Sequence, residues 1–123
     1  LFEGALEVLD YLSSKYNLHI ITNGFAEVQY KKIANSGLEG YFKTVTNSEM
    51  AGVKKPHRNI FEFALSLAKV DKQNALMIGD CIDADVRGAI EFGMEAILFD
   101  EKNTHTTATF TRINHLKELK NIL

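Results

Sequence analysis

The sequence predicts an α/β fold, a three-layer, Rossmann-like arrangement in which helices cover both faces of a parallel sheet. Segments with helical spacing of apolar residues alternate with short apolar runs along the chain, a single proline interrupts it, and polar residues follow several of the runs. Such alternation favours parallel strands joined by right-handed crossovers. In these sheets ligands bind beyond the carboxyl ends of the strands.

The individual elements follow from apolar periodicity and from the glycines that end helical patterns. Helices are predicted at residues 5–16, 26–36 (ending at Gly37), 60–68, 84–92 (ending at Gly93) and 116–123. Strands are predicted at residues 18–22, 44–46, 75–78 and 96–99.

Composition limits the chain to one globular domain over residues 1–123, since 46% of its residues are hydrophobic. The net charge is -2 and no basic cluster is present, which disfavours a nucleic-acid or membrane partner. Cys81 is the single cysteine and cannot form an internal disulfide. No long apolar run suggests a membrane span or signal peptide, so a cytoplasmic location is expected.

Three loops at predicted strand ends carry polar groups that can converge on one crevice. The first is Thr22-Asn23-Gly24, whose hydroxyl and backbone amides suit a phosphate oxygen, although Asn-Gly is also a common turn. The second contains Lys55, which the following Pro56 biases towards an extended backbone. Its ammonium could offset phosphate charge, and the alternative is a pair of solvated surface lysines with Lys54.

The third loop places three carboxylates, Asp80, Asp83 and Asp85, at a strand-to-helix junction. Their mutual repulsion requires compensation by a cation or by hydrogen-bond donors, and carboxylate oxygens suit Mg²⁺. The alternative is helix capping, which we expect for Asp83. Cys81 is expected to be a passive loop residue, because neighbouring carboxylates disfavour a thiolate.

Taken together and in this order, the three loops resemble motifs two to four of the haloacid dehalogenase (HAD) superfamily. Residues 20–24 resemble the second motif, Lys54-Lys55-Pro56 the third, and residues 79–85 with the following Gly88-Ala89 the fourth. The residues around Asn23-Gly24-Phe25 are most similar to the nucleotidase-like members.

The resemblance implies a Mg²⁺-dependent phosphatase that hydrolyses small phosphate monoesters, nucleotides first among them, through an aspartyl-phosphate. It implies that Thr22 and Lys55 are catalytic. It implies that the phosphate is bound by Thr22, Asn23, Gly24 and Lys55. Asp80 would bind Mg²⁺ as the cofactor, with Asp85 supporting the metal.

The chain departs from the family in its first motif, an Asp-x-Asp pair at the end of an N-terminal strand. No Asp-x-Asp precedes Thr22, because the one present, Asp83-Ala84-Asp85, belongs to the fourth motif. The cap that selects substrates is also missing. The resemblance thus implies the C-terminal part of a HAD core, inactive alone, whose parent protein is an enzyme.

In the family's sheet the missing strand lies between the strands that end at Thr22 and Asp80. Two unpaired inner edges would then be open to pairing. We expect an N-terminal segment of the same protein, or a second copy, to fill the gap.

Two other classes of protein remain as hypotheses. A receiver domain also uses acids, a threonine and a lysine at strand ends, but places its acids first and its lysine last. A non-catalytic or truncated module that binds phosphate or Mg²⁺ is the other alternative.

Overall fold

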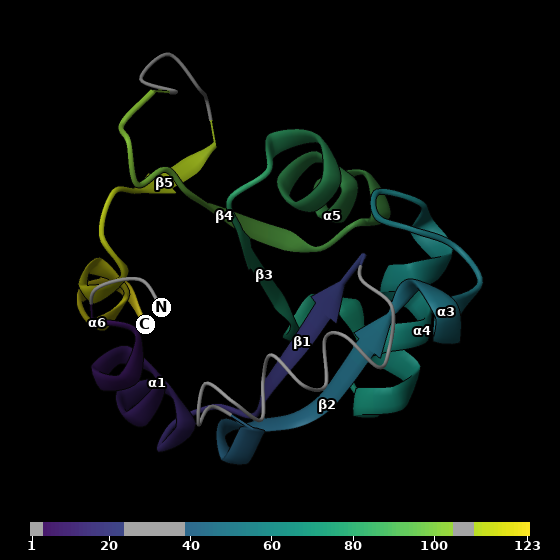
Figure 1. Cartoon of the computed structure of the whole chain (residues 1–123), viewed down its shortest axis with the longest axis horizontal. Coiled ribbons are helices and arrows are strands. Elements are labelled where there is room, and N and C mark those ends of the chain that lie inside the picture. The colour runs from purple at the N-terminus through teal and green to yellow at the C-terminus, as the bar shows by residue number, and fades with distance from the viewer. Residues whose placement is uncertain (1–3, 24–38, 105–109) are drawn as a thin grey trace.

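The computed structural model describes residues 4–23, 39–104 and 110–123, and its strands confirm the α/β class. All strand pairings in these residues are parallel. Two sheets are formed, one in the order β1-β2 and the other in the order β3-β4-β5 (Figure 1). The strands are β1 (Leu18–Thr22), β2 (Phe42–Asn47), β3 (Leu76–Gly79), β4 (Glu95–Phe99) and β5 (Thr111–Ile113).

The predicted helices at residues 5–16 and 60–68 are present, although the first ends at Ser13. The one at 84–92 begins with a π-helical turn, the last one is short, and a short helix at Ser48–Ala51 was not predicted. The predicted helix at residues 26–36 lies outside the described residues. None of the described helices has the length and apolar character needed to cross a bilayer. The α-helices are α1 (Ala5–Ser13), α3 (Ser48–Ala51), α4 (Arg58–Ala68), α5 (Gly88–Phe92) and α6 (Leu119–Ile122). The π-helical turn is η3 (Ile82–Arg87), and 3₁₀ turns are η1 (Glu39–Tyr41), η2 (Lys72–Asn74) and η4 (Leu116–Glu118).

Two apolar clusters cover opposite faces of the larger sheet, because side chains alternate along a strand. On one face Ile97 and Phe99 of β4 pack with residues of α1 and α6. On the other, Ala96 of β4 and Met77 of β3 pack with α4 and α5. Helices therefore cover both faces, as the sequence predicts, and burial of these side chains stabilises the fold.

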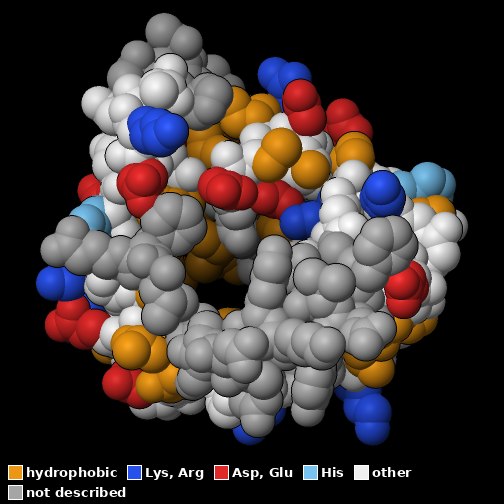
Figure 2. Space-filling model, in the orientation of Figure 1, with side chains coloured by type: hydrophobic (Ala, Val, Ile, Leu, Met, Phe, Trp, Pro, Cys, Tyr) orange, Lys and Arg blue, Asp and Glu red, His pale blue; other side chains and the backbone are white. Residues whose placement is uncertain are grey.

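The sheet is divided between β1 and β3. In the described part of the chain, β1 pairs with β2 alone and β3 with β4 alone, so each has an unpaired edge. Figure 2 shows the molecule hollowed near its centre. The division lies where the resemblance places a missing strand.

Candidate functional site

The loop after β1 carries Thr22 and Asn23. Thr22 is half-buried and lies opposite Asn47 of β2. Asn23 reaches the second loop: its Oδ1 accepts from the Lys55 N–H (2.7 Å) and its Nδ2 donates to the Lys55 carbonyl (3.3 Å). The third predicted residue here, Gly24, lies outside the described residues.

The second loop is held against α5. Gly88, the first residue of α5, has no Cβ, and one placed there would lie 2.9 Å from Cβ of Pro56 and 3.1 Å from the ring of Phe61. Only a residue without a side chain permits this approach. After Pro56, His57 caps α4, because its Nδ1 accepts from the Asn59 N–H (3.1 Å). His57 thus serves as an N-cap, a place where Asp or Asn is also common.

Lys55 and Asp85 join the second and third loops. The Lys55 Nζ lies 2.6 Å from Asp85 Oδ1, and both side chains are largely buried, with 13% and 6% exposed. The other oxygen of Asp85 accepts from the Cys81 N–H (3.2 Å). A side chain at Gly79 would overlap the Asp85 carboxyl group, so that glycine makes room for it. Lys54 is exposed, so the alternative of two solvated surface lysines holds for Lys54 and not for Lys55.

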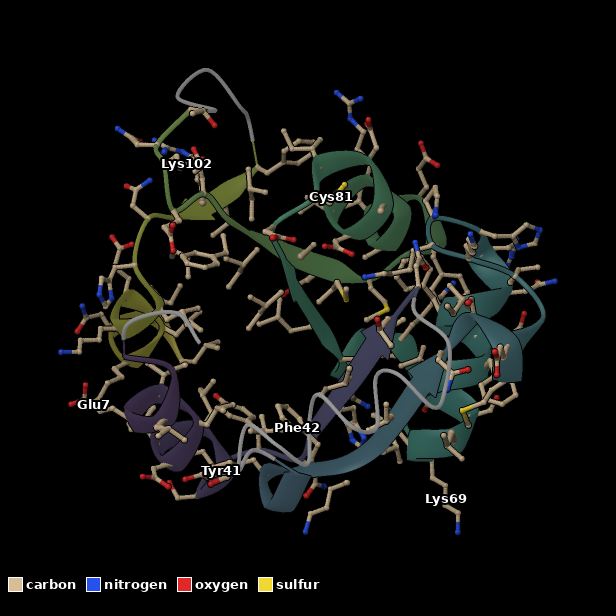
Figure 3. The ribbon with its side chains drawn as sticks, viewed as in Figure 1. Glu7, Tyr41, Phe42, Lys69, Cys81 and Lys102 are labelled. Carbon is tan, nitrogen blue, oxygen red and sulfur yellow. The ribbon has the colours of Figure 1, made fainter. Side chains whose placement is uncertain are left out.

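A π-helical turn presents Asp85 to Lys55. Both Asp85 and Val86 donate their N–H groups to the Cys81 carbonyl (3.0 and 3.2 Å), which widens the first turn of η3. Cys81, labelled in Figure 3, caps this turn: its Sγ accepts from the Ala84 N–H at 3.4 Å. The expectation that Asp83 caps the helix is therefore wrong. Asp83 instead pairs with Arg87 at the surface (3.2 Å), where the spacing of one turn favours an ion pair.

Asp80 follows β3 and is exposed, and the structure gives its carboxylate no partner among the described residues. No group of three His, Cys, Asp or Glu side chains there is arranged to hold a metal ion. Mg²⁺ usually takes one or two protein carboxylates and completes its shell with waters and substrate phosphate. Asp80, an exposed carboxylate at the end of β3, is of the ligand type that Mg²⁺ prefers. Figure 2 shows acidic side chains and a basic one near the central hollow.

The sequence did not predict one buried polar residue at the carboxyl end of the larger sheet. Asp100 directly follows β4 and is buried, and its carboxylate accepts from Thr104 N–H and Oγ1 (3.0 and 3.2 Å) and from Arg112 (3.2 Å). Because β3 and β4 are parallel, Asp100 lies at the same end of the sheet as Asp80. An acid immediately after an apolar run was the available signal.

The chain resembles known proteins in sequence and in fold. A family model for haloacid dehalogenase-like hydrolases matches residues 1–99. The chain belongs to this family. In sequence it is 33% identical to the pyrimidine 5'-nucleotidase YjjG of Escherichia coli over 98% of this chain, and 42% identical to the glyceraldehyde 3-phosphate phosphatase of Pyrococcus abyssi over 78%.

A solved structure of YfnB from Bacillus subtilis, described as a HAD-hydrolase bound to magnesium, has a TM-score of 0.90 at 31% identity. The matched region includes 100% of this chain and 55% of the YfnB chain. The chain likewise covers 55% of the E. coli nucleotidase and 41% of the P. abyssi phosphatase. It therefore spans about half the length of the curated HAD relatives it matches.

Proposed function

We propose that this chain is the phosphate-handling part of a Mg²⁺-dependent HAD phosphatase that hydrolyses small phosphate monoesters, nucleotides first among them. The contact that carries the proposal is the buried Lys55–Asp85 pair, since with Asn23 it links three loops at one sheet edge. Burying two charges costs desolvation free energy, so a buried ion pair is weak evidence for stability alone and favours a functional role for this pair. The names of two HAD relatives, a pyrimidine 5'-nucleotidase and a glyceraldehyde 3-phosphate phosphatase, support the substrate class.

Each side chain has a role in this proposal. The Thr22 hydroxyl and the backbone N–H groups of Asn23 and Gly24 hydrogen-bond the phosphoryl oxygens. The Lys55 ammonium stabilises negative charge as the phosphoryl group transfers. Asp80 would hold Mg²⁺ with support from Asp85. When bound, the ion would supply positive charge that offsets the charge of the phosphate.

The attacking group comes from outside residues 1–123. A carboxylate attacks phosphorus, the bond to the ester oxygen breaks, and water then hydrolyses the aspartyl-phosphate to inorganic phosphate. We place this carboxylate on a strand between β1 and β3, supplied by an N-terminal segment of the same protein or by a second copy. The unpaired edges of these strands and the half-length coverage of HAD relatives support this placement.

The proposed partner is a small phosphorylated substrate, not a nucleic acid or a membrane, because the net charge is -2 without a basic cluster. A cytoplasmic location is part of the proposal and rests on the single, unpaired Cys81.

The test compares this chain with a version extended at its N-terminus, both assayed with Mg²⁺ on p-nitrophenyl phosphate and on nucleoside monophosphates. Turnover is expected from the extended version alone. In that version Asp80→Asn should abolish the Mg²⁺-dependent rate, while Asp83→Asn, whose side chain is exposed, should leave it unchanged. Turnover by the short chain would refute the placement of the nucleophile.

A non-catalytic module that binds phosphate or Mg²⁺ is the second candidate, favoured by the absence of an Asp-x-Asp pair before Thr22. Phosphate binding without turnover by the extended version would support it.

A further inference from the structure

We infer that Asn23 is a positioning residue: its side chain sets the location of Lys55, and so the point at which the ammonium meets a substrate phosphate. The inference rests on the proposed function. It refines the predicted role of Asn23. The backbone N–H of Asn23 keeps its proposed role in binding the phosphate, while the side-chain amide holds the backbone of Lys55.

The contact engages both hydrogen-bonding groups of one residue. Asn23 Oδ1 accepts from the Lys55 N–H at 2.7 Å, and Nδ2 donates to the Lys55 carbonyl at 3.3 Å. The orientation of the amide is determined, since an N–H can only donate and a carbonyl can only accept. Two bonds from one planar group restrict both the position and the rotation of the Lys55 backbone.

Asn23 is itself anchored. Its carbonyl accepts from Ser48 Oγ at 3.2 Å, and Ser48 begins α3 directly after β2. Since Asn23 directly follows β1, the ends of two paired strands support the contact. The position of the Lys55 backbone is thus fixed by contacts with the ends of β1 and β2, and not only by the loop that contains Lys55.

Lys55 is held at both ends in the structure. The side chain of Asn23 holds its backbone, and Asp85 holds its Nζ at 2.6 Å. When the ammonium turns from Asp85 to a phosphate oxygen, the second restraint is lost and the first remains. A lysine side chain is long and flexible, so a displacement of its base shifts the ammonium from the reacting group.

Other side chains cannot reproduce this contact. Aspartate keeps the acceptor for the Lys55 N–H but loses the donor and adds negative charge where the phosphate is expected. Alanine removes both bonds and adds no charge, so Asn23→Ala is the cleaner variant.

A double-mutant cycle in the extended protein tests the inference, with p-nitrophenyl phosphate as substrate. We expect Asn23→Ala to lower kcat about 10- to 100-fold and Lys55→Ala about 100- to 1,000-fold. If Asn23 acts through Lys55, the double variant will match Lys55→Ala within about threefold. A double variant that falls a further tenfold or so would overturn the inference, because Asn23 would then act on the substrate by itself.

Amide hydrogen exchange provides a second readout that does not depend on turnover. In Asn23→Ala the Lys55 amide should exchange at least about tenfold faster, while the amide of buried Leu98 stays protected. Asn74→Ala, at an exposed asparagine of η2, is the matched control and should change neither rate. An unchanged Lys55 exchange rate in Asn23→Ala would refute the anchor. If the unmodified extended protein shows no turnover, the proposed function fails and exchange alone decides the anchor.

Discussion

Asp83 and Asp85 lie two residues apart in one turn, yet their surroundings differ. The Asp85 side chain is 6% exposed and contacts a lysine that is also largely buried, whereas the Asp83 side chain is 82% exposed and pairs with exposed Arg87. Removing one partner of a buried pair leaves an uncompensated charge, while an exposed pair contributes little to stability. The two carboxylates therefore form a matched comparison.

We predict that Asp85→Ala lowers the free energy of unfolding by about 3 kcal/mol, because Lys55 is left buried without its partner. Asp83→Ala should change it by less than about 0.5 kcal/mol. Urea titrations of both variants measure the difference. Equal losses would show that Asp85 contributes no more than a surface charge.

Gly79 provides a second prediction at this scale. Gly79→Ala adds a methyl group that overlaps the Asp85 carboxyl group, so either the backbone or the aspartate must move. We expect a loss of about 1–3 kcal/mol in the free energy of unfolding, typical of overpacking. Gly40→Ala is the control, since a Cβ added there has no close neighbour within 4 Å among the described residues. Thermal melts of the two variants test this, and equal melting temperatures would contradict it.

The convergence of the loops was predictable at the residue scale, because polar residues follow the carboxyl ends of parallel strands. The structure brings Lys55 of the second loop onto Asp85 of the third. The catalytic and metal roles of these residues stay predictions. The contact between Asn23 and Lys55 could not be foreseen, because it joins residues that are 32 positions apart.

At the scale of elements, the runs that contain apolar residues were predicted as strands, while a short run with two polar residues was missed. The run at residues 75–78 lies within one residue of β3 (Leu76–Gly79) at each end. β5 was missed because Thr111 and Arg112 are polar, and its strand character depends on pairing with β4. The π-helical turn was also missed, since the Asp85 contact with Lys55, 30 residues away, accompanies it.

A titratable side chain, that of His19, lies between the paired strands β1 and β2. His19 of β1 lies with its Nδ1 2.8 Å from Thr44 Oγ1 of β2. Burial, and to a lesser degree the charge of Lys43, lower the pKa of His19 below its ordinary 6.5. The neutral ring is thus favoured in the folded state, and the unfolded chain takes up the proton first.

We therefore predict that acid weakens this chain partly through His19. Its contribution to stability should be complete above pH 6.5 and decline as the pH falls below that value. His19→Gln should flatten the dependence of the unfolding free energy on pH between about 7.5 and 5.5. Urea titrations across that range check it, and an unaltered slope would contradict the assignment.

At the scale of the whole molecule, the division between β1 and β3 has the largest consequence. Both strands present an unpaired edge within the described residues, and such edges pair readily with another chain. We predict that this chain expressed alone associates or binds an added N-terminal segment, whereas the extended version is stable without such association. Light scattering after gel filtration measures the mass of both, and a stable monomer of the short chain would contradict the prediction.

The parallel sheet, the helices on both faces and the HAD family were predictable, because alternation and the order of the loops are properties of the whole chain. The polar network around Asp100 was not. It depends on Arg112, which reaches the end of β4 from β5. Contacts between neighbouring strands of this kind become visible only when the order of the strands in the sheet is known.

The wide turn at Ile82–Arg87 makes the loop after β3 sensitive to length rather than to composition. It contains six residues with a spacing wider than an α-helix. Deleting one residue, such as Ala84, would leave Val86 donating to the Cys81 carbonyl at ordinary α-helical spacing, so the extra residue of the turn would be lost. Asp85 would then lie three residues from Cys81 instead of four, and its contacts with the Cys81 N–H and with Lys55 would have to form from a new position, although every acid of the loop would still be present. Insertions and deletions here should therefore be far more damaging than most substitutions.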